Sequence, residues 1–225
     1  MPNWVNVKMT VSGEEAEVKN FFKKHIGSDG DLDFNTIVPE PQTKDECPAD
    51  CYVSANSFIA SDSLRPWFDW YKWHLMFWGC KWNASSTEVV DNTIYFDTPW
   101  NDPRPILVAL TKMYPSLTFD YMWVEEQGAY DTGHIIVKNN TPSLVNIPDE
   151  FSDEAYKIMF EMWGNECEYL RDIDKQEYVF IDDELRDEYD QFVADWKKDT
   201  DRVGQEPPCI EEWYNNDKKE CEANA

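Results

Sequence analysis

The sequence predicts an α+β fold in which an antiparallel sheet carries helices on one face. Short segments of alternating apolar and polar residues occur before and after segments whose apolar residues recur every three to four positions. Over residues 6–138 the predicted order is strand, helix, inserted helix, strand, strand, helix, strand, strand. Apart from the insertion and the last strand, this is the order of the ferredoxin-like split βαβ arrangement. In such folds the helices bury their apolar faces against the sheet.

The first predicted strand covers residues 6–11, where apolar and polar residues alternate. Ser12 and Glu15 have the spacing of a capping box, in which each side chain satisfies a free backbone amide at a helix N-terminus. A helix is therefore expected to begin here and to run to Gly27.

The stretch after this helix does not fit a central strand. Pro39 and Pro41 each lack the amide hydrogen that a central strand donates to its neighbour. We therefore expect an insertion over about residues 28–80. It includes an aromatic helix that opens at Ser63–Pro66, because proline is tolerated in a first helical turn. Helical spacing places on one face of it Trp67, Trp70, Tyr71, His74 and Trp78.

Four strands and a helix are predicted after the insertion. The helix covers residues 103–113, with Asn101 or Asp102 as its expected N-cap. Asp91–Asn92 is a plausible tight turn between the first two strands. The strands cover residues 87–90, 93–96, 117–125 and 134–138.

The C-terminal third differs in composition. A helix is predicted over residues 151–163, ending at Gly164, then an extended segment at 178–181 and a second helix at 185–196. The expected domains are a ferredoxin-like domain over residues 1–145, an acidic, mainly helical module over 146–204 and a polar tail over 205–225. That tail is anchored at most by Ile210, Trp213 and Tyr214.

The net charge excludes several classes of partner. With 20 basic and 45 acidic residues the formal charge is −25, which repels nucleic acid and anionic membranes at long range. No apolar run is long enough to span a bilayer, and the N-terminus has no leader pattern. The six cysteines are scattered, so we expect reduced thiols in a cytoplasmic protein, with no metal and no cofactor.

Acidic residues are concentrated in the C-terminal part. From Asp149 onward there are 25 acidic and 9 basic residues. Such runs are commonly the solvated face of a helix, but they also imitate the phosphate spacing of DNA when they accumulate against like-charge repulsion. The candidate residues for partner binding are Asp182, Asp183, Glu184, Asp187, Glu188 and Asp190.

The aromatic segment 67–82 allows two interpretations. Its five tryptophans can form the wall of a core, since burying one large aromatic side chain stabilises by roughly 2–3 kcal/mol. Alternatively, its end forms a pocket for a planar ligand such as a nucleobase. The candidate contacts of that pocket are Trp78, Lys81, Trp82 and Trp100. A hydrolytic site built on His74 or His134 is a third hypothesis.

Several motifs in the first 140 residues resemble those of a known family. They are Met1–Trp4 with Asn6, Asp33–Phe34 with Ile37–Pro41, Trp78–Asn83, Phe96–Trp100 with Pro103 and Pro105, and Tyr114–Pro115, in this order. Together they resemble the YubB-like family of ferredoxin-like proteins carried by plasmids, phages and pathogenicity islands. Val5 stands where that family is expected to have cysteine, and Cys80 where threonine is commoner. The resemblance implies a fold and a mobile-element setting, and it implies no catalytic mechanism.

These observations lead to two main hypotheses of function. The first is a non-enzymatic phage or plasmid accessory protein in the host cytoplasm that binds and inhibits a host factor. Its acidic module would occupy a protein that handles nucleic acid, as an anti-defence DNA mimic. The alternative is a protein that captures a small nucleotide signal in an aromatic pocket of the ferredoxin-like domain.

Overall fold

The computed structural model describes residues 2–53, 64–199, 202 and 205–218 of the 225-residue chain. Its centre is a six-stranded antiparallel sheet with the strand order β2-β3-β1-β4-β5-β6. The strands are β1 (Trp4–Ser12), β2 (Ser85–Val90), β3 (Thr93–Pro99), β4 (Thr118–Glu125), β5 (Gly128–Lys138) and β6 (Thr141–Asn146). The α+β class is confirmed.

The position of β1 confirms the ferredoxin-like topology. β1 lies between β3 and β4 and is antiparallel to both, so the first strand of the chain is a central strand. β5 and β6 extend the sheet beyond β4 as a meander. β6 was not predicted.

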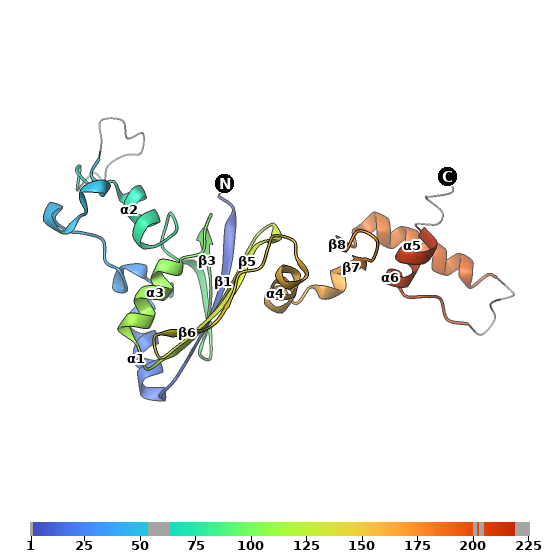
Figure 1. The fold of residues 1–225 in the computed structure, drawn as a ribbon, viewed down its shortest axis with the longest axis horizontal. Helices are drawn as coiled ribbons and strands as arrows, with labels where there is room; N and C mark the ends of the chain where they lie inside the picture. Colours follow the sequence, from blue (N-terminus) through green and yellow to red (C-terminus); the bar gives the residue numbers. More distant parts are fainter. Residues whose placement is uncertain (1, 54–63, 200–201, 203–204, 219–225) are drawn as a thin grey trace.

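Two helices cover one face of the sheet, α1 (Glu15–His25) and α3 (Arg104–Met113) (Figure 1). Along β1 the odd-numbered residues are buried on this face and the even-numbered ones are not, which is the period-two pattern of a half-buried strand. The apolar side of α3 enters the same core through Ile106, Leu107 and Leu110. This core also receives Phe21 of α1.

The predicted caps of both helices are wrong. Ser12 is the last residue of β1 and pairs with Thr118, so α1 begins after Glu14, whose side chain makes no capping hydrogen bond. At α3 the N-cap is Pro103. The Asp102 carboxylate accepts hydrogen bonds from the side chains of Arg104, the first residue of α3, and Tyr121. In both places the strand or the core determines where the helix starts.

The described residues between α1 and β2 form an irregular layer with three short 3-10 turns and one α-helix. The turns are Phe34–Thr36, Lys44–Glu46 and Ala49–Cys51, and the helix is α2 (Trp70–Phe77). The predicted helix start is wrong. Pro66 lies in a turn, α2 begins after Asp69, whose side chain accepts from the Lys72 amide, and Ser63 lies outside the described residues.

The buried face of α2 also differs from the predicted one. Trp73 and His74 are buried on this helix, whereas Trp70 and Tyr71 are only partly buried. Because α2 begins later than expected, Trp67 precedes the helix and does not share its periodicity.

The first helix of the C-terminal part, α4 (Asp153–Trp163), packs on the opposite face of the sheet (Figure 1). Its residues Ala155, Ile158 and Met159 meet Met122 and Val124, which point away from the α1 and α3 side of β4. The helix ends, as predicted, at Gly164, whose φ of 68° is a left-handed conformation that glycine adopts without steric cost. The sheet is therefore covered on both faces.

The remaining chain forms a small unit that projects away from the sheet (Figure 1). A two-stranded hairpin, β7 (Tyr169–Asp172) with β8 (Glu177–Phe180), packs with α5 (Asp183–Trp196) and α6 (Ile210–Trp213). The core of this unit consists of Leu170, Ile181, Leu185 and Trp213. Within the described residues, no helix combines the length and apolar character needed to cross a membrane.

Candidate functional site

The acidic face of α5 lies opposite its apolar face. The side chains that pack inward are Leu185, Tyr189 and Phe192, and most of the carboxylates fall on the other side at helical spacing. All six residues predicted for partner binding are exposed: Asp182, Asp183, Glu184, Asp187, Glu188 and Asp190. The structure thus brings them together on one helix.

Two of the six also have structural roles. Asp182 is the N-cap of α5, and its Oδ1 accepts from the Leu185 amide at 2.8 Å. Glu188 forms an ion pair with Lys218. Within the described chain, no ion pair or side-chain hydrogen bond is recorded for Asp183, Glu184, Asp187 or Asp190.

These four carboxylates differ in how their position along the helix affects its stability. Asp183 and Glu184 lie in the first turn, where the positive end of the helix dipole stabilises them. Asp187 and Asp190 lie beyond that turn and are three residues apart. Asp187 also follows Asp183 by four residues and Glu184 by three, and each such like-charged pair costs about 0.2–0.5 kcal/mol. Asp187 and Asp190 are therefore the carboxylates that the local stability of α5 does not explain.

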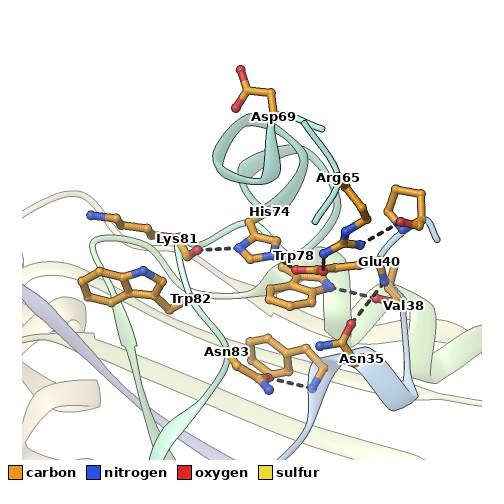
Figure 2. Close-up of polar contacts among 12 residues, drawn as sticks. Asn35, Val38, Glu40, Arg65, Asp69, His74, Trp78, Lys81, Trp82 and Asn83 are labelled. Atoms are coloured by element: carbon orange, nitrogen blue, oxygen red, sulfur yellow. Dashed lines mark hydrogen bonds and ion pairs between the residues drawn. The ribbon is translucent and has the colours of Figure 1, made fainter. Parts of the chain in front are cut away.

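Of the predicted aromatic pocket, Trp78 lies in the core. Its side chain is 2% exposed, and its ring stacks on His74 with centroids 3.9 Å apart. Trp78 Nε1 donates to the carbonyl oxygen of Val38 at 2.9 Å (Figure 2).

His74 is held by a polar network at the same place (Figure 2). Its Nδ1 donates to the Lys81 carbonyl at 2.7 Å, because a carbonyl oxygen only accepts, and Nε2 lies 2.6 Å from Glu40 Oε1. The hydrogen bond from His74 lowers the pKa of Glu40, and Arg65 adds to this effect. Both ring nitrogens are thus engaged in tying α2 to chain segments on either side of it, at Glu40 and Lys81.

The other predicted histidine, His134, lies on β5, where its Nε2 is 2.7 Å from Asp120 Oδ1. Cys80 lies six residues after His74 in the sequence and is a candidate nucleophile. Its thiol is buried, and burial raises its pKa to about 12. A thiol with this pKa stays protonated near neutral pH and is a poor nucleophile.

The other three predicted pocket residues form an exposed cluster. Lys81 Nζ lies 4.3 Å from the ring centroid of Trp82 and 4.6 Å from that of Trp100. These two rings are 41% and 40% exposed, respectively. The structure therefore brings Lys81, Trp82 and Trp100 together as a cation between two accessible indoles, with Tyr71 edge-on to Trp100.

Beside Trp100 lies a cavity that the sequence did not predict. It has a volume of about 660 Å³ and opens at the end of the sheet where β1 begins and β3 and β4 end. It is lined by Asn3, Trp100, Asn101, Glu125, Tyr130, Asp131, Thr132 and residues 147–150. The only sequence sign of it is the turn after β4, where two glutamates precede Gln127 and Gly128.

A buried carboxylate, Asp102, directly follows the cavity residue Asn101 in the chain. Asp102 accepts hydrogen bonds from Arg104 Nε at 2.9 Å and from the Tyr121 hydroxyl at 3.3 Å. Burial raises the pKa of Asp102 to about 6 although Arg104 opposes this shift, and the nearby Asp131 adds to it.

Asp102 is expected to make stability depend on pH. Because its pKa is about 6 when folded and 3.8 ordinarily, the folded state binds the proton more tightly. The free energy of unfolding therefore falls as pH rises between about 4 and 6. At about 1.4 kcal/mol per pKa unit, the wild type should lose about 1 kcal/mol relative to Asp102→Asn between pH 5 and pH 7. Urea denaturation of both proteins at the two pH values measures this, and an unchanged difference would contradict it.

The comparisons with known proteins agree with this topology. A family model described as the ferredoxin-like domain in Api92-like protein matches residues 77–166. No curated protein and no solved structure matches the chain. The matched range covers β2 to β6, α3 and α4, and leaves out β1, α1 and the unit that carries α5. Residues 77–166 are thus similar to the ferredoxin-like domain of Api92-like proteins, a part of the molecule that includes most of the sheet.

Proposed function

We propose that this protein is a non-enzymatic accessory protein of a phage or plasmid that binds and inhibits a host protein through the acidic face of α5. The observation that carries the proposal is the exposure of Asp187 and Asp190, which stability does not explain. The mobile-element setting rests on the resemblance of the N-terminal motifs to the YubB-like family.

The charge density of α5 supports a partner that normally binds nucleic acid. From Asp182 to Asp190 the helix rises about 12 Å, at about 1.5 Å per residue. Six carboxylates lie along this length, with Arg186 as the one cation between them. Duplex DNA carries one phosphate charge per about 1.7 Å of its axis, or roughly seven over the same distance. A protein surface built for DNA would therefore meet a similar line of charge.

Reversing Asp187 and Asp190 to lysine is expected to remove this interaction. The doubly substituted protein, immobilised and exposed to host lysate, should retain about tenfold less of the partner that the wild type captures, equivalent to about 1.4 kcal/mol. Captured proteins are identified and quantified by mass spectrometry. Excess duplex DNA should release the same partner from the wild type, because both ligands would occupy one surface.

A matched control separates the site from net charge. Asp45 and Glu88 are exposed and lie away from α5, in the insertion and on β2. Reversing both to lysine changes the net charge by the same amount and should leave capture unchanged. Equal loss in the two variants, or no loss in the first, would refute a role for the α5 face.

A second candidate function is capture of a small nucleotide at the Lys81, Trp82 and Trp100 cluster. The favouring observation is the pair of accessible indoles around one cation, since a base can stack on a ring while a lysine contacts phosphate. Against it stand the carboxylates of the cavity next to Trp100, which repel phosphate. Calorimetric titration with cyclic nucleotides tests this second function, and repeating it on Trp82→Ala tests whether any binding is at the cluster. Absence of heat in the wild type would rule this function out.

A further inference from the structure

Two residues that line the cavity beside Trp100 each have a buried side-chain oxygen without a partner in the described chain. Glu125 is 4% exposed and Thr132 is 3% exposed, and both line the cavity. Within the described residues, neither Glu125 Oε1 nor Thr132 Oγ1 has a hydrogen-bond partner. The other carboxylate oxygen, Glu125 Oε2, accepts from the Gln127 amide at 2.7 Å. Leaving a buried acceptor unsatisfied is costly, so these atoms point to a ligand that supplies the missing donors.

The wall of the cavity determines the charge of that ligand. Among the described residues, its lining includes four acidic ones, Glu125, Asp131, Asp149 and Glu150, and no lysine or arginine. Two cations lie close by, but each is already engaged: Lys81 over the rings of Trp82 and Trp100, and Arg104 with Asp102. An anionic ligand would be repelled, and a cation would be attracted.

The kind of cation follows from the other lining groups. Trp100 and Tyr130 both line the cavity, and aromatic faces attract ammonium and guanidinium groups. Within the described chain, no group of three or more histidine, cysteine, aspartate or glutamate side chains could hold a metal ion. The volume of about 660 Å³ is also far larger than a bare ion needs and falls in the range of organic ligands.

The backbone around the cavity is built to hold these groups in place. The pairing of β4 with β5 shifts between Val124 and Glu125, so that residues 129–131 of β5 have no partner on β4 and bulge. Bulges of this kind redirect side chains and are frequent beside binding sites. Across the cavity, Trp100 has a φ of 69°, unusual for a bulky residue, and its amide donates to the Asn3 carbonyl at 2.8 Å.

We propose that this cavity binds an organic cation, an alkylammonium or guanidinium group, with Glu125 as its counter-ion, Thr132 as a second acceptor and Trp100 and Tyr130 as its aromatic wall. The site is distinct from the acidic face of α5, and it goes beyond the function proposed above. The same chemistry occurs in a free polyamine and in the lysine or arginine side chain of a protein.

Isothermal titration calorimetry in physiological salt tests the proposal with three probes. Spermidine represents a free amine, N-acetyl-arginine amide represents a protein side chain, and N-acetyl-citrulline amide is the neutral isostere of the second probe. At least one cationic probe should bind and the citrulline probe should not. The tighter of the two cations identifies the source. No saturable heat from either cation at millimolar concentration would overturn the proposal.

Substitution of the counter-ion connects binding to the cavity. Glu125→Gln keeps the size of the side chain and should lower the affinity for the cation by about 30-fold or more, as expected when one member of a buried charge pair is lost. Glu88→Gln, an exposed change of the same charge on β2, should leave affinity within a factor of two. Equal affinities in these two variants would show that the cation is attracted only by the overall charge of the protein and would overturn the site.

Two further variants guard against misfolding and against confusion with α5. Asp149 and Glu150 are exposed, so the double substitution Asp149→Asn with Glu150→Gln leaves the core untouched. It should still lower the affinity for the cation by at least threefold. The variant with Asp187 and Asp190 changed to lysine should bind the cation within threefold of the wild type. If the α5 variant lost binding while the variant changed at Asp149 and Glu150 kept it, the cation would be bound at α5, and the proposal of a cation site in the cavity would be refuted.

Discussion

Replacing Trp78 with alanine is expected to lower the free energy of unfolding by about 4 kcal/mol, within the 3–5 kcal/mol usual for a buried aromatic residue. Three losses add together. The change leaves a cavity between Phe34 and Trp73, whose rings lie edge-on to Trp78 with centroids 5.7 Å away in each case. It removes the ring that stacks on His74, and it leaves the Val38 carbonyl without its donor.

Trp82→Ala is the matched control for this prediction. Trp82 belongs to the same aromatic segment but is 41% exposed, and its ring contacts Lys81. Its loss should cost less than about 1 kcal/mol, the value of an exposed cation–π contact. Urea denaturation followed by far-ultraviolet circular dichroism measures both variants. If Trp78→Ala cost no more than Trp82→Ala, the interpretation of Trp78 as core wall would be wrong.

Gly133→Ala is expected to destabilise the protein by about 3 kcal/mol, the upper end of the usual cost of overpacking. A Cβ at Gly133 would lie 2.0 Å from a ring atom of Trp123. The ring cannot easily move aside, because the Arg104 guanidinium lies 5.0 Å from its centroid and its Nε1 donates to Asp131 at 3.0 Å. Glycine is therefore required here for space, to let Trp123 lie across β5.

A double-mutant cycle tests whether the clash with Trp123 is the cause. Trp123→Leu removes the ring, so adding Gly133→Ala to that variant should cost at least 1.5 kcal/mol less than in the wild type. Gly27→Ala is the control, since its Cβ would meet mainly the flexible side chain of Asp29. Its cost should stay within about 1 kcal/mol. Additive effects of the Trp123 and Gly133 substitutions would show that the ring is not responsible.

The strands and the long helices could be predicted because their patterns are local. Alternation over 6–11 and helical spacing over 151–163 each indicate one buried face, and both elements formed. The spacing does not indicate the surface against which that face is buried. α4 lies on the far side of the sheet because Met122 and Val124 leave an apolar patch there.

Helix starts and the candidate cavity depend on distant parts of the chain. The capping box at Ser12 has the right spacing, but pairing of Ser12 with Thr118 keeps the residue in β1. In the sequence, Glu125 is a polar residue at the end of a strand. In the structure it is buried beside a cavity that residues from the β5 bulge and residues 147–150 also line. The acidic face of α5 could be predicted because its carboxylates are neighbours in sequence.

The central place of β1 has a consequence for how the chain reaches its native state. During synthesis β1 is made first, yet Val5 must wait for Thr98 on one side and Glu125 on the other. At 5–20 residues per second a ribosome needs on the order of ten seconds to supply them. Until then at least one edge of β1 is unpaired and open to other chains. Yield in rapid expression should therefore depend on chaperones that shield nascent β1.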